Sequence, residues 1–208
     1  NRHNVMARTR ALDYEDRKKD ILKAAAVLFA RKGYSETLLE DIAEQCGMKK
    51  SSLYHYHRSK HAILHSLISW KIEDLAWKVE AAVEQEQSAE KKLRAFTQTL
   101  VSEYIRVPEE VTVLLTQMRY LNRPAMRSVI VIQERIINRA IILIQTLRPD
   151  VEMSRKKVTA LAMMYFGMTN WIHVWYKPSG SIKPADLSAL IVDTFVNGVQ
   201  NLAVEQLN

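Results

Sequence analysis

Hydrophobic positions repeat with the period of an α-helix along most of this chain. One apolar face runs from Tyr14 to Arg31 and contains Ile21, Leu22, Ala25, Leu28 and Phe29. Acidic residues stand early and basic residues late in this segment, as the helix dipole prefers, and Gly33 follows as a stop. The alternation typical of half-buried strands hardly appears, and 5 glycines and 5 prolines leave little turn material. The pattern predicts an all-α protein.

Two short helices follow, with a glycine between them. Thr37 is the expected N-cap of the first, and Glu40, three residues later, would complete a capping box before Gly47 ends the helix. The second covers residues 50–57, with Leu53 facing inward and an outward face of Lys50, Ser51, Tyr54 and His55. Two short helices joined by a glycine-centred turn are typical of a helix-turn-helix.

Six more helices are predicted in the rest of the chain, at about 60–86, 89–107, 108–121, 124–147, 155–177 and 186–205. Ser59, Ser88 and Ser154 are the expected N-caps, and Pro108 suits a first helical position. The helix at 124–147 is apolar on nearly all sides, which predicts a central, buried position. About nine helices result. They form a helix-turn-helix domain at 14–59 and a second helical domain at 60–208, after a flexible basic N-terminal arm at 1–13.

Composition excludes several classes of protein. The single cysteine, Cys46, rules out an internal disulfide and a cysteine-rich zinc site. No window approaches the roughly 18 apolar residues that span a membrane, and no N-terminal stretch has the apolar core of a secretory signal. We therefore expect a cytoplasmic protein with no membrane partner.

Positive charge is concentrated in the N-terminal part of the chain. The formal net charge is +7; residues 1–60 hold 13 Lys and Arg against 8 Asp and Glu, whereas residues 61–208 hold 17 against 15. This asymmetry indicates that the N-terminal part meets a polyanion.

The stretch KKSSLYHYHRSKHAI, residues 49–63, combines lysines, serines, tyrosines and histidines. His57, His61 and His65 fall four apart, but Ser59 breaks that helix and no carboxylate lies nearby, which disfavours a metal site. No nucleophile is paired with a base, here or in residues 61–208, so we expect no enzyme. DNA contact explains more of the stretch: Lys50 can donate to guanine O6 and N7, while Tyr54 and Lys60 suit phosphates.

The segment ILKAAAVLFARKGYSETLLEDIAEQCGMKKSSLYHYHRSKHAIL, residues 21–64, closely resembles the DNA-binding domain of the TetR family of bacterial transcriptional repressors. The resemblance implies phosphate contacts from Thr37, Tyr54 and Lys60. It also implies base contacts from Lys49, Lys50, Ser51, Ser52, His55 and Tyr56. Two residues depart from the family pattern. Lys49 replaces a capping serine, so that Ser51 or Ser52 would have to cap, and His57 replaces a phenylalanine. We expect His57 to be a hydrogen-bonded packing residue and not a pH sensor.

One helix-turn-helix covers too little DNA for useful affinity, so a homodimer is expected. The last two predicted helices carry more apolar surface than one side of a bundle needs, and the resemblance implies that they form a four-helix interface with a second copy. The resemblance further implies that residues 60–208 form a ligand-binding and dimerisation domain, because the family binds small molecules inside its C-terminal domain. Candidate ligand contacts here are Met118, Arg119, Arg123, Met163, Phe166, Asn170, Trp171 and Trp175. Each of these residues also suits a core, dimer or solvated position.

The segment GMTNWIHVWYKPSGSIKPADL, residues 167–187, resembles the C-terminal region of TetR-type regulators that respond to acyl-coenzyme A thioesters. That resemblance implies an acyl chain among methionine and tryptophan side chains and nucleotide phosphates near arginines. The expected function is a dimeric repressor of operator DNA that a small-molecule effector releases, with no other cofactor. The alternative is the same fold sensing amphipathic cationic drugs and regulating an efflux pump.

Overall fold

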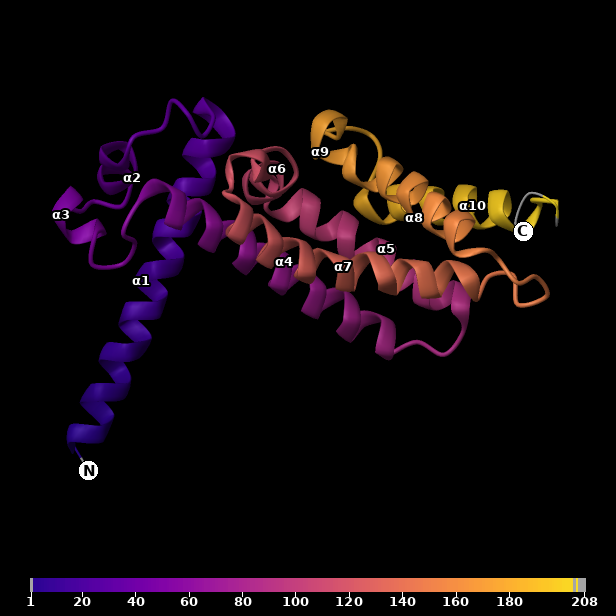
Figure 1. Cartoon of the computed structure of the whole chain (residues 1–208), viewed down its shortest axis with the longest axis horizontal. Helices are drawn as coiled ribbons and strands as arrows, with labels where there is room; N and C mark the ends of the chain where they lie inside the picture. Colours follow the sequence, from indigo (N-terminus) through magenta and orange to yellow (C-terminus); the bar gives the residue numbers. More distant parts are fainter. Residues whose placement is uncertain (1, 204, 206–208) are drawn as a thin grey trace. The chain divides into compact units, whose positions relative to one another are not determined.

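The computed structural model describes the backbone of residues 2–203 and 205, and the side chains from Asp13 onward within that range. The all-α prediction is confirmed: every regular element among these residues is helical (Figure 1). None of these helices is long and apolar enough to cross a membrane. In chain order the elements are α1 (Arg2–Lys32), α2 (Leu39–Gln45), α3 (Lys50–Leu53), α4 (Lys60–Glu84), α5 (Ala89–Arg106), α6 (Pro108–Thr116), the 3-10 turn η1 (Met118–Tyr120), α7 (Arg123–Gln145), α8 (Arg155–Asn170), α9 (Ile172–Trp175) and α10 (Pro184–Gln200).

The chain divides into two compact units. The first comprises residues 1–71 and 109–127, and the second comprises residues 72–108 and 128–208. The helix-turn-helix unit is thus larger than the segment 14–59 expected from the sequence, because it includes the first turns of α4 and the stretch from α6 to the start of α7. Both α4 and α7 run from one unit into the other without a break.

Two glycines shape the first unit. Gly33, with a φ of 84°, ends α1, and its N–H donates to the carbonyl of Phe29 at 3.0 Å. Gly47, with a φ of 63°, turns the chain between α2 and α3, and the N–H of the next residue, Met48, returns to the carbonyl of Ala43 at 2.9 Å. Glycine adopts this left-handed conformation without steric cost, so the chain can reverse abruptly after each helix.

Helix α1 begins earlier than predicted. The expected start was Tyr14, whereas the helix extends back to Arg2. Residues 2–13 contain no glycine or proline and several good helix formers, so nothing local stops the helix even though the apolar period is absent. The side chains of the expected basic arm, before Asp13, lie outside the described residues.

The cap of α2 also differs from the prediction. Its N-cap is Leu38 and not Thr37, and the carboxylate of Asp41 accepts the Leu38 N–H at 3.0 Å. Thr37 instead turns inward, fully buried, and donates its hydroxyl to the carbonyl of Gly33 at 2.8 Å. The capping role predicted for Glu40 therefore belongs to its neighbour, and the Glu40 carboxylate serves another contact.

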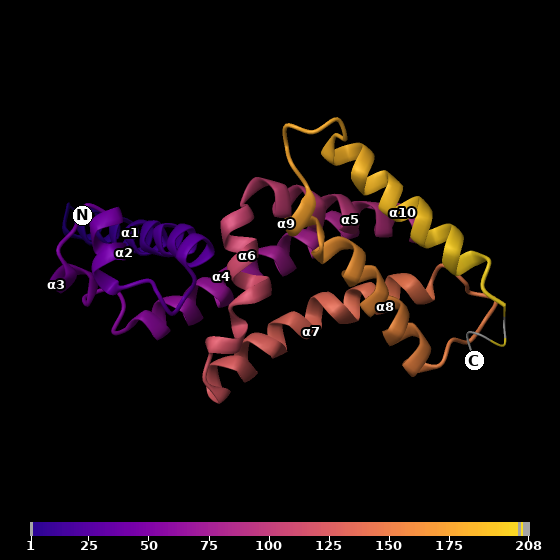
Figure 2. The ribbon, with the colours of Figure 1, turned by 90° about the horizontal axis from the view of Figure 1, so that it is seen from above.

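The second unit has an aromatic core. Helix α10 packs along α5 (Figures 1 and 2). Tyr165 of α8 is fully buried between Phe96 of α5, with ring centroids 6.1 Å apart, and Phe195 of α10, at 5.3 Å. Burial raises the pKa of the Tyr165 phenol, so its hydroxyl stays protonated and hydrogen-bonds with that of Thr97 at 2.8 Å.

The prediction of a central, buried helix at 124–147 was wrong. Helix α7 has an exposed side that includes Val131 and Ile142, because polar residues interrupt the apolar run at helical spacing. One of them, Arg135, forms ion pairs with Glu73 and Glu80 of α4 at 2.9 and 3.0 Å.

The helix predicted from Ser154 to Lys177 is two helices, α8 and α9, which Trp171 separates. Ser154 is the N-cap residue of α8, but its side chain makes no capping hydrogen bond. The break accounts for the one α-helix beyond the nine expected, within the part of the chain that the structure describes.

Candidate nucleic-acid interface

Helix α3 has a polar, exposed outer surface. Its inward residue is Leu53, which is 1% exposed. The exposed members of the predicted DNA-binding set are Lys49, Lys50, Ser51, Tyr54 and His55. Ser52 and Tyr56 are half-buried. The first residues of a recognition helix are those that reach base edges in the major groove, so this arrangement fits a duplex-reading surface.

The helix predicted at 50–57 ends at Leu53, and the turn that follows it is attached to α1. The Tyr14 hydroxyl donates to the backbone carbonyl of His55 at 3.2 Å, and the Tyr14 ring stacks on that of Tyr56 with centroids 4.9 Å apart. Tyr56, predicted to approach the bases, therefore packs on α1. These contacts limit how far α3 can tilt on its support.

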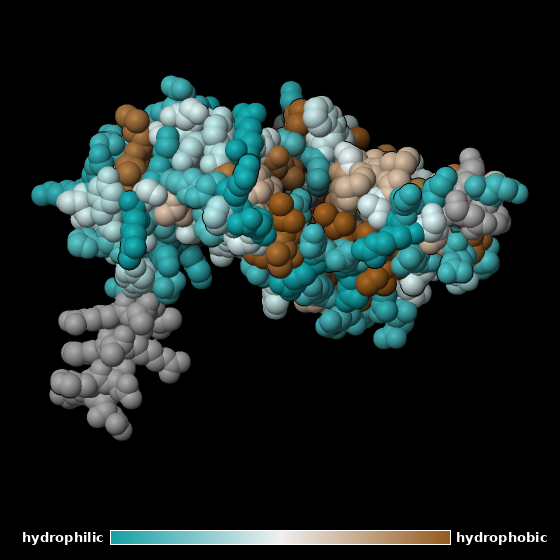
Figure 3. Space-filling view, viewed as in Figure 1, coloured by the Kyte–Doolittle hydropathy of each residue, from teal (hydrophilic) through white to brown (hydrophobic). Residues whose placement is uncertain are grey.

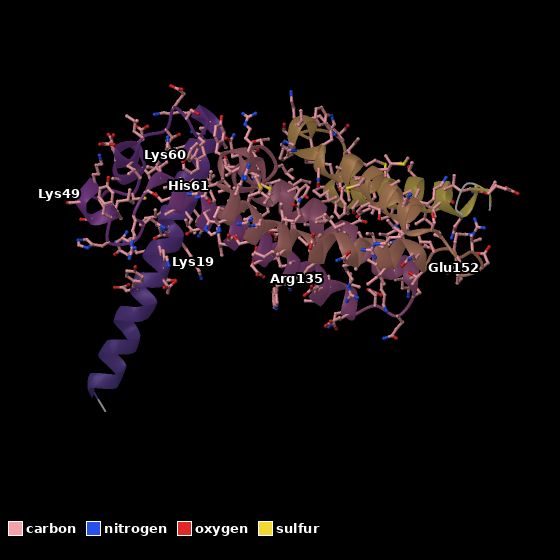
Figure 4. All side chains as sticks on the ribbon, viewed as in Figure 1. Lys19, Lys49, Lys60, His61, Arg135 and Glu152 are labelled. Carbon is pink, nitrogen blue, oxygen red and sulfur yellow. The ribbon has the colours of Figure 1, made fainter. Side chains whose placement is uncertain are left out.

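Lys49 and Lys50 have different surroundings. Lys49 is the N-cap residue of α3, lies on its outer side (Figure 4), and forms no ion pair with any described residue. No side-chain hydrogen bond from Lys49 caps the helix. Lys50, the first helical residue, forms a close ion pair with Glu40 of α2. The shared hydrogen bond raises the pKa of Lys50 and lowers the pKa of Glu40, so both groups are charged.

Lys60 has a structural role. Its ammonium donates to the backbone carbonyls of residues 34, 35 and 37 at 2.7, 3.1 and 2.8 Å, which uses all three of its N–H groups. It also lies 4.5 Å from the centre of the Tyr34 ring. Its amine and the buried hydroxyl of Thr37 are thus engaged within the protein, and this geometry does not favour the phosphate contacts predicted for them.

The loop between α1 and α2 also contacts the segment that follows α6, within the same unit. The rings of Tyr34 and Tyr120 lie 4.9 Å apart, and a hydrogen bond with Ser35 lowers the pKa of the Tyr120 phenol. At the start of α4, His61 Nε2 accepts the backbone N–H of Asn122 at 3.0 Å. Figure 4 shows Lys60 and His61 together at this position. The α6–α7 segment therefore supports the helix-turn-helix.

His57 is a packing residue without the expected hydrogen bond. It is 4% exposed, and its Nε2 atom has no partner among the described residues. Burial, with a smaller contribution from Lys18, lowers the pKa of its imidazole. The described side chains include no group of three or more His, Cys, Asp or Glu arranged to hold a metal ion.

The predicted ligand contacts belong to both units. Met118, Arg119 and Arg123 lie in the first; the Arg119 guanidinium stands 5.1 Å from the Tyr120 ring. In the second unit, Asn170 accepts the Tyr104 hydroxyl at 2.8 Å and Phe166 packs against Phe96. Met163, Trp171 and Trp175 are exposed.

An apolar groove lies on the surface of the second unit between α8 and α10. Exposed side chains on it include Met164, Trp171 and Leu190, at 65%, 61% and 59%. Figure 3 shows apolar side chains on the visible face of the second unit, whereas that of the first unit is mostly hydrophilic. The residues that line the groove are Leu161, Met164, Gly167, Met168, Trp171, Trp175, Ile182, Leu187, Leu190, Ile191, Thr194, Phe195, Gly198, Val199 and Leu202.

Two family models match this chain. The family described as bacterial regulatory proteins, tetR family, matches residues 21–67, and the tetracyclin repressor-like, C-terminal domain matches residues 86–199. The second match alone covers more than half of the chain. The helix-turn-helix and the helical C-terminal part thus each have counterparts in one family.

Individual relatives agree with these matches. A crystal structure of a TetR-family transcriptional regulator from Bordetella parapertussis superposes with a TM-score of 0.83 at 31% identity, over 89% of this chain and 97% of that one. The HTH-type transcriptional repressor KstR2 of Rhodococcus jostii is 25% identical over 174 residues, which cover 80% of this chain and 82% of that protein. Two regulators of Bacillus subtilis match at 37% and 38% identity over 57 and 56 residues only, so the chain spans about a fifth of their lengths.

The fold also occurs in a complex of known composition. AibR, solved with isovaleryl coenzyme A and operator DNA, superposes with a TM-score of 0.77 at 23% identity, over 86% of this chain and 97% of that one. At this identity the similarity concerns the fold.

Proposed function

Because the chain belongs to the TetR family of bacterial regulatory proteins, we propose that it is a dimeric repressor that reads operator DNA with the start of α3 and is released by a small molecule. The observation that carries this proposal is the exposed polar surface of α3, with two lysines at the end that enters a major groove. Its charge attracts phosphates, and its serines and histidine can bond base edges.

The anchoring of α3 supports the same role. A reading helix discriminates between sequences only when its backbone holds one position, since a mobile helix can adjust to any base pair. The Leu53 side chain of α3 is buried, and Tyr14 holds the turn after the helix by a hydrogen bond to His55 and a ring stacked on Tyr56. The outward side chains are thus presented from a fixed support.

A second copy is the proposed occupant of the α8–α10 groove. Large apolar side chains such as Trp171 and Leu190 are costly to leave in water, and a patch of this kind marks an association surface. A two-fold axis through the groove would pair the same side chains from each chain and supply the second helix-turn-helix that an operator with two half-sites requires. In this arrangement Trp171 and Trp175 belong to the interface and not to a ligand site.

For the effector we propose an acyl-coenzyme A thioester. The support is the resemblance of residues 167–187 to regulators that respond to such thioesters, together with the isovaleryl coenzyme A bound by AibR, which shares this fold. Flexible methionine side chains suit an acyl chain of variable shape, and arginines such as Arg119 and Arg123 suit nucleotide phosphates. An effector releases DNA only if it binds the DNA-free form more tightly.

One experiment tests the function and the effector class in sequence. An operator is first selected from random duplexes with the purified chain. A panel of acyl-coenzyme A esters, free coenzyme A and a cationic dye is then titrated into the protein–operator complex, and fluorescence anisotropy records release. Release by one or more thioesters at concentrations where free coenzyme A has no effect supports the proposal. Release by the dye alone would favour a sensor of cationic drugs.

A further inference from the structure

The ion pair between Lys50 and Glu40 brings a hydrogen-bond donor and an acceptor together at the start of α3. Lys50 is the first residue of α3, and Glu40 is the second residue of α2. Both side chains are open to solvent, at 43% and 57% exposure. The pair lies at the end of the helix-turn-helix that is expected to enter the groove. Because both side chains are exposed, their head groups can contact a ligand.

Local structure does not require the Glu40 carboxylate. Its neighbour Asp41 caps α2 by accepting the Leu38 N–H and also pairs with Lys32 at 3.3 Å. Glu40 makes neither contact, and its ion pair is with Lys50. A lone carboxylate on a surface that approaches phosphates is repelled by them. Beside Lys50 it belongs to a pair with no net charge, which can come close to DNA.

The hydrogen-bond pattern of the pair matches one type of base pair. In the major groove a G·C pair presents two adjacent acceptors, guanine N7 and O6, followed by one donor, cytosine N4. An ammonium can donate to both acceptors while a carboxylate beside it accepts from the donor. An A·T pair alternates acceptor, donor and acceptor and ends in a methyl group. There the ammonium would meet one acceptor next to a competing donor.

We infer that Lys50 and Glu40 together read a G·C base pair in each half of the operator. Lys50 donates to guanine O6 and N7, and Glu40 accepts from the amino group of cytosine N4. The inference rests on the proposed function, in which the start of α3 enters the major groove. Glu40 is thus a specificity-determining residue on α2, and Lys49 takes the separate task of phosphate contact.

The two members of the pair should respond differently to removal. Lys50→Ala leaves the Glu40 carboxylate unpaired before the phosphates, so the affinity for every sequence falls. Glu40→Ala frees the Lys50 ammonium, so binding to unrelated DNA rises, and the preference for G·C falls to the part that Lys50 alone supplies at guanine N7 and O6. The double variant should bind better than Lys50→Ala alone, because it removes the repulsion that the single variant leaves. Glu44→Ala is the matched control, since it deletes the same charge from an exposed position on the same helix.

Binding sites are selected from random duplexes with the wild type, Glu40→Ala and Glu44→Ala. The affinity of each protein is then measured for the site that the wild type selects and for versions of that site in which one G·C pair is replaced by A·T. The wild type should favour G·C at one position per half-site by roughly 5- to 150-fold. Glu40→Ala should reduce that preference by about threefold or more, because the contact to cytosine N4 is lost, and Glu44→Ala should preserve it. Lys50→Ala and the double variant are compared on the same site. Circular dichroism confirms that each variant is folded.

The outcomes separate this inference from the proposed function. If the wild type selects no sequence, the function itself fails, and the role of the pair fails with it. If the wild type selects a site and Glu40→Ala keeps every base preference, only the role of Glu40 is overturned. Equal binding by Lys50→Ala and the double variant would also overturn the role of Glu40, because its carboxylate would then have no effect on DNA binding.

Discussion

The two units of the chain expose different side chains. Among the described residues, the large apolar side chains exposed in the first unit are Tyr14, Leu38 and Tyr54. The second unit exposes eleven, and several of them, including Met164, Trp171 and Leu190, lie along one groove. In the first unit, by contrast, the exposed side chains at the outer end of α2 and α3 include the charged residues Lys49, Lys50 and Glu40.

This difference indicates a division of tasks. A surface that meets a polyanion must stay hydrated and charged before binding, whereas a surface that meets a second copy gains by removing apolar area from water. The first unit is held together by internal hydrogen bonds, such as the three that the Lys60 ammonium donates to backbone carbonyls. Its outer face stays polar. The second unit leaves apolar area exposed, which suits the proposed contact with a second copy.

The largest expected effect concerns the internal charges of the first unit. Lys71 and Glu110 are buried, with 3.6 Å between Nζ and Oε2. Lys71→Met should lower the free energy of unfolding by roughly 3–5 kcal/mol, because the Glu110 carboxylate would lose a buried partner. Urea denaturation measures this. The double variant Lys71→Met with Glu110→Leu should recover most of the loss. If the single and double variants are equally unstable, the loss of stability does not come from an unpaired Glu110 carboxylate.

The next effect tests the apolar groove. Leu190→Glu should weaken the dimer by at least roughly a hundredfold, about 3 kcal/mol, because an unpaired carboxylate would be buried at the contact. Sedimentation velocity across a concentration series gives the dissociation constant. Val131→Glu is the control, since Val131 is 64% exposed but lies on α7, outside the groove. Equal dissociation in both variants would move the interface away from α8 and α10.

A smaller effect separates the two lysines of α3. Lys49→Ala should weaken binding to all duplexes by a similar factor and reduce the slope of log affinity against log salt by about 0.9, the contribution of one phosphate contact. Lys177→Ala removes the same charge from an exposed site in the second unit and should leave both quantities unchanged. A change of base preference in Lys49→Ala, measured on the selected operator, would contradict the assignment of Lys49 to phosphate.

The smallest effect is a pH dependence confined to the first unit. Burial lowers the pKa of His57 in the folded chain, whereas the unfolded chain binds a proton near the ordinary value of about 6.5. The stability of the folded state is therefore fully present above that pH and falls as the pH drops toward the lowered value. The slope reaches at most about 1.4 kcal/mol per pH unit. Unfolding free energies at pH 7.5 and 5.5, compared with His57→Phe, isolate this contribution. Parallel pH profiles would show that His57 titrates alike in both states.

Local signals predicted most of the fold. Ser59 accepts the Ala62 N–H at 3.1 Å and Ser88 accepts the Lys91 N–H at 3.3 Å, as their positions before apolar periods indicated. Pro108 opens α6 as predicted. Caps and periods act within one helical turn, so a sequence displays them directly.

Long-range pairings were not visible in the sequence. Glu40 was interpreted as a capping residue because it lies three positions after Thr37, yet its partner Lys50 is ten positions away on another helix. Lys60 was assigned to phosphate, although its ammonium bonds carbonyls more than twenty residues earlier in the chain. A turn places such groups next to each other only after folding. The sequence did contain one signal: Glu40 and Asp41 are adjacent acidic residues at the start of α2, and the helix cap uses only one of them. The other carboxylate is then free to pair elsewhere.

In the proposed function the start of α3 enters a duplex groove, and a symmetric pair of chains presents it twice. The most direct measurement is sedimentation of the purified chain alone and with a duplex that carries the selected site, at low and at physiological salt. We expect a dimer without DNA, an even number of chains on each duplex, and affinity that falls steeply with salt. A lone chain in solution, or no binding of double-stranded DNA at low salt, would contradict it.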